Sequence, residues 1–312
     1  MLFHIKELQQ KFIIHQRGVV LIIALFVMTL IAVMAVAMMA RLQRDTYRTS
    51  LVIHATQAEL YAQGSVAWAM QQLRDNKEKN RLDNAPIHLP VKQIYEYRID
   101  SVIEDAQGYF NLNNLADSAV QQDFQRLLRA VVPQLNAQAG MDIARALTDW
   151  VTPGVHNSVY DRYYLSLKPA YRAAHRPMLS VSELRLVKGV TPALYNALLP
   201  YVTALPEKTA INVQSALPQV LMSLSPTLNL SVVQQIVSHR QVTPFTTLEK
   251  FTGLEVVKNH AIAADKVTVN STYFLVVTTV MVESETYRLY TLLSRLVQNE
   301  RLQVKMLWQS KH

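Results

Sequence analysis

Hydrophobic and polar positions divide the chain into an apolar N-terminal part, a helical middle and two groups of strands. The run from Val19 to Ala40 contains no charged residue and no proline. At a rise of 1.5 Å per residue it predicts a helix of roughly 33 Å, which is long enough to cross the hydrocarbon core of a bilayer. The run therefore predicts a membrane span.

The helical period continues beyond this run to about Leu73. Side chains that recur every three or four positions share one face of a helix, and small ones let a neighbouring element approach closely. We expect one long helix whose second half packs against a sheet, followed by a polar loop over 74–84. The expected contact face is a stripe of mostly small residues: Leu51, Ala55, Ala58, Ala62, Ser65 and Ala69.

Two groups of strands flank the helical middle. Alternation with period two predicts a strand over 93–103, a turn over 104–108 and a second strand over 109–113, which together form a hairpin. Three further runs predict a C-terminal meander, over 268–282, 287–297 and 302–308.

The helical middle extends from Asp117 to about Asp265. Its expected helices cover 121–132, 142–150, 181–187, 192–201, 218–224, 231–240 and 247–251. A two-stranded hairpin is barely stable alone, so we expect the strands before and after the helices to share one sheet. The predicted fold is α+β, with a long N-terminal transmembrane and amphipathic helix on an antiparallel sheet and a large all-helical domain inserted in that sheet. The expected divisions are 1–18, a leader; 19–40, the transmembrane helix; 41–116, the helix extension and first strands; 117–265, the insertion; and 266–312, the last strands.

The leader before the apolar run leaves three processing histories open. It could belong to a cleaved signal peptide, to a permanent signal anchor, or to a prepilin that is cut on the cytoplasmic side of the run. The apolar run is longer than the core of a signal peptide, although Ala35-Val36-Ala37 has the small residues of a signal-peptidase site. The junction of Gly18 and Val19 is typical of a prepilin peptidase site, and a cut there leaves the whole apolar helix on the mature protein.

Charge alone does not orient the span. Arg41, Arg44 and Arg48 follow the run and balance the three basic residues of the leader. The positive-inside rule depends on a difference between the two sides, and here it is nearly absent.

Composition excludes several classes of function. The chain has no cysteine, so disulfides, thiolate metal sites and cysteine nucleophiles are absent. Its seven glycines form no GxGxxG or GxxxxGK loop, and no HExxH or GxSxG motif is present. The net charge of +8 is spread along a chain with only 17% charged residues, which favours a solvated basic surface. We assign no catalytic residue.

Two segments of the helical middle resemble degenerate helix-hairpin-helix units, at 186–193 and 249–255. A DNA-binding hairpin offers glycine-rich backbone amides to phosphate. Each of these has a single glycine, and Glu183, Glu249 and Glu255 are nearby. We expect helix packing here and no nucleic acid as partner.

Several segments occur in an order that resembles the general secretion pathway protein K family, a minor pseudopilin of the type II secretion system. The resemblance covers nearly the full length. Besides the leader and the apolar helix, its segments are 57–64 with Trp68, 105–113, 147–150, 171–177, 182–184 and 209–213.

The resemblance implies a structural role in the bacterial inner membrane. It implies a single-pass anchor with a cytoplasmic N-terminus and a periplasmic globular part, cleavage by the prepilin peptidase, and a pilin fold with an inserted helical domain. It also implies a place at the tip of a periplasmic pseudopilus, in a complex with two other minor pseudopilins that initiates the filament. Most pilins carry Glu at the fifth mature residue, and Ile23 stands there instead, as the resemblance implies for a tip subunit.

The resemblance also raises the question of calcium. The family usually has an acid-rich calcium loop after the Asp-Trp pair, but 151–158 contains no carboxylate. Calcium takes six to eight oxygen ligands, and Asp149 and Asp161 alone are weak remnants of such a cage. We expect this site to be lost or weakened, with no cofactor assigned. The alternative functions are a signal-anchored periplasmic enzyme and a DNA-uptake pseudopilin.

Overall fold

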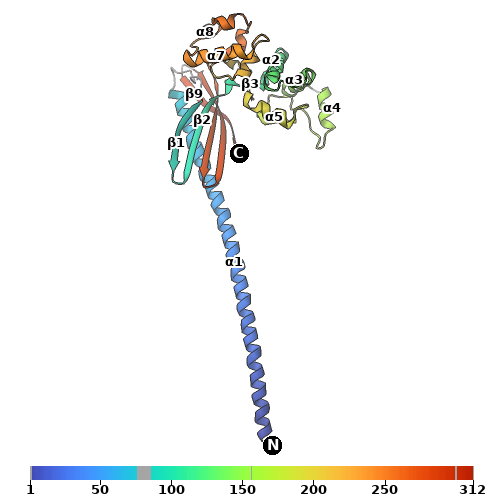
Figure 1. Cartoon of the computed structure of the whole chain (residues 1–312), viewed down its shortest axis with the longest axis vertical. Coiled ribbons are helices and arrows are strands. Elements are labelled where there is room, and N and C mark those ends of the chain that lie inside the picture. Colours follow the sequence, from blue (N-terminus) through green and yellow to red (C-terminus); the bar gives the residue numbers. More distant parts are fainter. Residues whose placement is uncertain (1, 76–85, 156, 299–300, 312) are drawn as a thin grey trace. The chain divides into compact units, whose positions relative to one another are not determined.

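The computed structural model describes residues 2–75, 86–155, 157–298 and 301–311. The chain divides into two compact units, Met1–Leu60 and Tyr61–His312. Helix α1, Leu2–Asp75, is the one element that belongs to both (Figure 1). Most of the polar loop expected over 74–84 lies outside the described residues.

The second unit contains a five-stranded antiparallel sheet with the order β1-β2-β7-β8-β9 (Figure 1). β2 pairs with β7 from Tyr97 opposite Val282 to Asp105 opposite Phe274. Strands from before and after the helical middle therefore share one sheet, which confirms the inserted α+β fold and the C-terminal meander. The strands are β1, Ile87–Ile94; β2, Tyr97–Asp105; β7, Tyr273–Val282; β8, Glu285–Gln298; and β9, Arg301–Lys311.

The predicted first hairpin is wrong. β2 pairs with β1, and the turn between them falls at Tyr95 and Glu96, inside the stretch that we expected to be one strand. Tyr95 has a positive φ of 52°, which lets the chain reverse in a tight turn. Residues 106–108 form a 3₁₀ turn that leads the chain out of the sheet, and β3, Phe110–Asn111, lies in another sheet.

The last turns of α1 pack through the predicted small-residue stripe. Ala62 and Ala69 are buried, together with Val66 and Leu73. Ser65 lies 2.5 Å from the hydroxyl of Ser101 on β2, which in turn donates to Thr278 on β7 at 3.0 Å. Three hydroxyl groups thus link the helix to two adjacent strands. Such short distances require small side chains on α1, because these permit close approach.

The insertion between β2 and β7 contains α2 to α9. Two of these, α4 and α9, have no counterpart among the expected helices. The expected helix over 181–187 is a 3₁₀ helix, Val181–Leu186. The α-helices are α2, Gln121–Val131; α3, Ala137–Val151; α4, Val159–Leu165; α5, Pro192–Leu198; α6, Pro218–Met222; α7, Leu230–Val242; α8, Leu248–Thr252; and α9, Glu255–Lys258.

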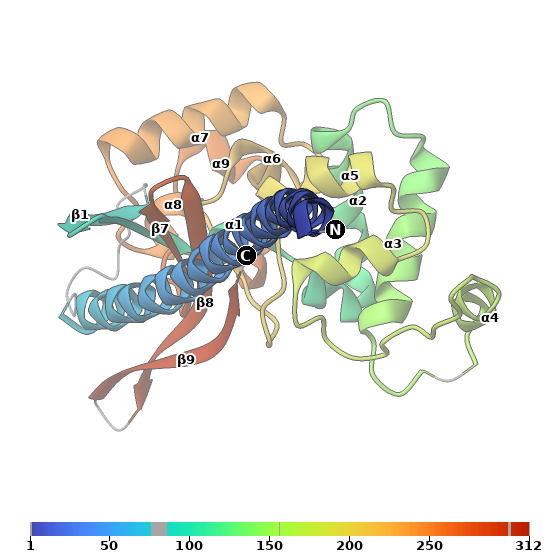
Figure 2. The same cartoon turned by 90° about the horizontal axis from the view of Figure 1, so that it is seen from below.

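The insertion is not all-helical, which corrects the prediction. Four strands of two residues form two parallel pairs: β3 with β4, Val202–Thr203, and β5, Ile211–Asn212, with β6, Val267–Thr268. The run expected to form one strand over 268–282 therefore divides into β6 and β7. Figure 2 shows α3 on one side of the insertion and α7 on the other, and one hydrophobic core joins the two sides.

Candidate functional site

The N-terminal segment combines the predicted processing and anchoring residues in one helix. The side chains from Val19 to Ala40 are exposed, and Val19 and Ile23 are each 56% exposed. This part of α1 has a mean hydropathy of 3.2 over its most apolar 18 residues, and length and composition suffice for a membrane span. Gly18 lies within α1 directly before this surface. Cleavage after Gly18 remains a prediction.

A buried carboxylate joins the insertion to the sheet. Asp105, at the end of β2, accepts hydrogen bonds from Asn212 (2.7 Å), Ser215 (2.6 Å) and Ser271 (2.8 Å), and from the backbone N–H of Gln107 (2.9 Å). We call these residues the Asp105 hub. Burial raises the pKa of Asp105, and the hydrogen bonds to its carboxylate offset part of that rise. Three segments distant in sequence meet at this one side chain.

Arg295 and Gly108 lie beside the hub. Burial lowers the pKa of Arg295 on β8, while the neighbouring Asp105 raises it. A Cβ on Gly108 would lie 2.7 Å from the hydroxyl of Ser215, so only glycine fits against this segment. The hub therefore depends on close backbone contact as well as on charge.

Asparagine side chains hold the irregular segments of the insertion in place. Asn113 donates to the backbone oxygens of Met178 (3.0 Å) and Leu205 (2.8 Å) and accepts from the backbone N–H of Met178 (2.7 Å). Asn111 accepts from the backbone N–H of Leu205 at 3.0 Å and donates to the carbonyl oxygen of Glu207 at 2.8 Å. These side chains replace the backbone ladder that regular elements would supply.

The predicted calcium remnants lie in a connected group that also contains Ser158 and His175. Ser158 donates to Asp149 at 3.0 Å and caps α4 by accepting from the backbone N–H of Asp161. His175 Nε2 lies 3.1 Å from Asp161 Oδ2, and its Nδ1 lies 3.0 Å from the backbone oxygen of Asp149. The backbone N–H of Ala173 donates to the other Asp161 oxygen at 3.3 Å.

The pKa values of the two carboxyls shift in opposite directions. Burial raises the pKa of Asp161, whereas the contacts with His175 and the Ala173 amide lower it by more. The pKa of Asp161 therefore lies below its usual range. Burial raises the pKa of Asp149 above its usual value, against the hydrogen bond from Ser158. Among the described residues, no group of three or more His, Asp or Glu side chains could hold a metal ion. These residues therefore do not fit calcium.

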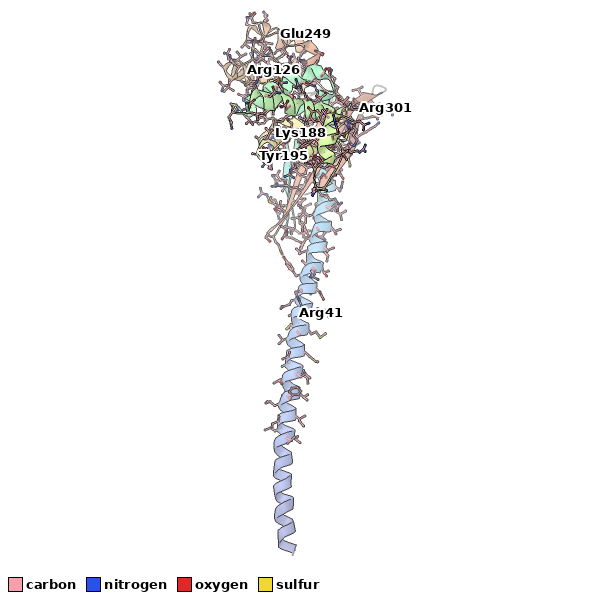
Figure 3. All side chains as sticks on the ribbon, turned by 90° about the vertical axis from the view of Figure 1, so that its right-hand side faces the viewer. Arg41, Arg126, Lys188, Tyr195, Glu249 and Arg301 are labelled. Carbon is pink, nitrogen blue, oxygen red and sulfur yellow. The ribbon has the colours of Figure 1, made fainter. Side chains whose placement is uncertain are left out.

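The two segments that resemble helix-hairpin-helix units are packed internally. A Cβ on Gly189 would lie 2.9 Å from Ile143 of α3, and Gly189 has a φ of +88°. The backbone N–H of Lys188 donates to the hydroxyl of Tyr164 at 3.1 Å, and the Lys188 ammonium lies 4.6 Å above the Tyr163 ring. Arg185 lies 4.7 Å above the ring of Tyr195, which Figure 3 labels together with Lys188. In the first hairpin, both the backbone N–H and the side chain of Lys188 therefore make contacts within the protein.

Comparisons with known proteins agree with this architecture. The family models for type II secretion system protein K match residues 108–207 and 211–270. The type II secretion system protein K of Pseudomonas aeruginosa is 32% identical over 231 residues, covering 67% of this chain and 68% of that protein. This chain belongs to the type II secretion system protein K family.

Two further relatives extend the likeness to most of the chain. The protein K of Klebsiella pneumoniae is 28% identical over 306 residues, which cover 90% of this chain and 93% of that protein. A crystal structure of the GspK–GspI–GspJ complex from enterotoxigenic Escherichia coli contains a chain with the same fold, at a TM-score of 0.71 and 23% identity, covering 85% of this chain and 99% of that one. The chain thus shares the fold of that GspK chain over most of its length.

The structure explains two of the segments that carry the resemblance to the protein K family. Segments 105–113 and 209–213 supply the Asp105 hub and the asparagine contacts, so they hold the insertion together. The role of His175 was not predicted, although it lies in the quoted segment 171–177. A hydrophobic pattern cannot reveal its positive φ of 45° or its contact with Asp161, which is 14 positions away.

Proposed function

We propose that this protein K is a tip subunit that assembles with other minor pseudopilins and initiates the periplasmic pseudopilus. Its apolar helix anchors it once in the bacterial inner membrane, with the globular part in the periplasm, and it carries out no catalysis. The observation that carries the proposal is its likeness to protein K chains over most of their length, since one such chain was solved together with GspI and GspJ.

Processing by the prepilin peptidase is the first step of this function. We expect the mature protein to start at Val19, so that the whole apolar surface stays on the subunit. Gly18→Trp should block maturation because the bulky ring obstructs the scissile bond, whereas His15→Trp, three positions upstream, should mature normally. N-terminal sequencing of membrane-extracted protein checks this, and a start near Met38 or an uncut chain would contradict it.

The exposed part of α1 beyond the membrane span offers a helix-binding stripe. At 100° per residue, Leu42, Ile53 and Leu60 lie within about 20° of one line along the helix. All three are exposed. Thr49 and Thr56 lie beside that line and are also exposed, and each hydroxyl donates to a carbonyl oxygen of its own helix at 2.8 Å. We call these five residues the α1 stripe.

Such a stripe suits partner helices. Contiguous exposed apolar side chains mark interaction sites, and an amphipathic helix binds through anchors at this spacing. The stripe lies on the face opposite to the small residues that include Ala58 and Ala62. One face of α1 is therefore used within the subunit, and the other is open to neighbouring pseudopilins.

Co-purification with the two partner minor pseudopilins tests this function. Ile53→Asp should remove at least nine tenths of the recovered partner, because a buried unpaired charge opposes association by several kcal/mol. Val52→Asp is the matched control: Val52 is 65% exposed and Ile53 is 51%, but Val52 points about 100° away. Equal recovery of partners by Ile53→Asp and the unchanged protein would refute this mode of assembly.

Nucleic-acid binding has less support. The DNA-uptake function would need free amides in the hairpins, whereas the Lys188 N–H is bonded to Tyr164 and the Leu254 N–H to the carbonyl oxygen of Phe251. The enzyme function would need convergent polar groups in a pocket, whereas the hub and the asparagines use theirs to join segments of the chain.

A further inference from the structure

We infer that His175 closes the outer segment of the insertion in the place of a metal ion, so that this protein K folds and stays folded without calcium. The segment runs from the end of α3 through α4 to His175. The inference concerns the stability of this chain and stands independently of its place in the filament.

The first argument concerns the groups that contact the Asp161 carboxylate. Asp161 Oδ1 accepts a hydrogen bond from the Ala173 N–H, and Asp161 Oδ2 lies 3.1 Å from His175 Nε2. Calcium binds six to eight oxygen atoms, with carboxylates as its strongest ligands. A cation beside Asp161 would meet the Ala173 N–H at one carboxylate oxygen and the His175 ring at the other.

The position of His175 carries the second step. Its two ring nitrogens reach two separate parts of the segment, the Asp149 backbone oxygen at the end of α3 and the Asp161 side chain in the first turn of α4. Because a carbonyl oxygen only accepts, Nδ1 carries a proton there. The ring thus bridges α3 and α4, as an ion shared by both would. We call this arrangement the His175 clasp.

The backbone conformation supports a specific role for this residue. His175 has a φ of 45°, in the left-handed region that non-glycine residues rarely adopt. The clasp buries the ring, whose side chain is 15% exposed, against an Asp161 side chain that is 7% exposed. A surface histidine would not need this conformation, so the contacts of the ring stabilise it.

Neighbouring contacts complete the closure without a cation. The Arg176 N–H donates to the backbone oxygen of Trp150 at 3.3 Å, directly after the clasp. Behind it, the rings of Trp150, Tyr164 and Tyr171 pack with centroid separations of 5.2 to 6.4 Å. Protein groups alone therefore connect both ends of the segment.

Thermal unfolding of the full-length protein in detergent tests the inference. We expect the midpoint to be the same in millimolar calcium and in EDTA, because a metal that binds only the folded state would raise it. A midpoint that rises with calcium and falls with EDTA would overturn the inference, and this arm needs no variant.

Two substitutions sharpen the test. His175→Ala should lower the midpoint by roughly 4–8 °C, since it removes two buried contacts from a unit of this size. The matched control His88→Ala, at an exposed position of β1, should leave it unchanged. If both substitutions have the same effect, the clasp is not what holds the segment.

The last experiment introduces a metal site by substitution. His175→Asp would set a third carboxylate against Asp149 and Asp161 and remove the ring that bonds to Asp161. We expect calcium, added as the chloride, to raise the midpoint of His175→Asp and of no other variant. If calcium leaves that midpoint unchanged, the ring does not stand where a cation would bind, and the inference fails.

Discussion

The layer of α1 and the five-stranded sheet differs from the insertion in what holds it together. The sheet has strands of up to 14 residues joined by backbone ladders, with register shifts only in the β1–β2 and β8–β9 pairs, and α1 covers it with small side chains. The insertion has helices of 4 to 15 residues whose connections are held by Asp105, Asn111 and Asn113. A substitution in the first region should change one packing contact, whereas one at these side chains should release several segments together.

The largest expected loss comes from Asn113→Ala. It would leave the N–H and carbonyl oxygen of Met178 and the carbonyl oxygen of Leu205 without this partner in a buried place. Each buried polar group that loses its bond costs about 1–3 kcal/mol, so we expect a loss of about 4 kcal/mol. Denaturant unfolding followed by circular dichroism measures it.

The control for Asn113→Ala is Asn196→Ala, on an exposed position of α5. Alanine favours a helix interior over asparagine, so this change should cost nothing. Equal losses at both positions would remove the contrast between the two regions.

Packing of α1 on the sheet should be less sensitive. Ala69 is fully buried on the small-residue stripe, and Ala69→Leu should destabilise by about 2 kcal/mol because the extra atoms force α1 away from its neighbours. Ala67→Leu makes the same change at an exposed position of the same helix and should be neutral. A neutral Ala69→Leu would show that the helix is loosely packed there.

The Asp105 hub, where the sheet meets the insertion, should make the stability of the protein depend on pH. Burial raises the folded-state pKa of Asp105 above 3.8, so the folded protein binds this proton more tightly than the unfolded chain. The associated stability is present below pH 3.8 and is lost as the pH rises through the raised pKa. The loss amounts to about 1.4 kcal/mol for every tenfold difference in proton affinity between the folded and unfolded states.

Comparison with Asp105→Asn isolates that contribution. The difference in unfolding free energy between the unchanged protein and Asp105→Asn should move in favour of Asp105→Asn as the pH rises from the acid side. The neighbouring Arg295 attracts the ionised Asp105 and not the neutral asparagine side chain of the variant, so this attraction is part of the measured difference. A difference that is constant with pH would show that solvent or Arg295 compensates the buried charge fully.

The same contrast explains how much of the fold the sequence predicts. The long apolar helix, the small-residue stripe of α1 and the C-terminal meander each follow a regular period, and the structure confirms them. The first hairpin was wrong because 104–108 has the composition of a turn within a sheet, whereas Asp105 bonds to residues more than a hundred positions away. Hydrophobic periods contain no information about such partners.

The candidate sites also divide into features that the sequence could predict and features that it could not. The lack of carboxylates over 151–158 already argued against calcium at Asp149 and Asp161, because counting ligands needs no structure. The replacement by His175 could not be predicted, since it depends on a left-handed residue that folds back onto α4. Gly18, Val19 and the partners of α1 involve other proteins, and they remain predictions.

The smallest expected effect, at Gly64, separates stability from assembly. Gly64 lies within α1 with open space around the position of a Cβ, so Gly64→Ala should stabilise the isolated subunit by about 0.5–1 kcal/mol. At 100° per residue Gly64 lies about 40° from the line of the α1 stripe, so a close partner helix would meet the added methyl group. We therefore expect the variant to unfold at higher denaturant yet to recover less partner in co-purification. Gains in both measurements would show that partners do not approach α1 at Gly64, and a loss of stability would show that the glycine serves the subunit's own fold.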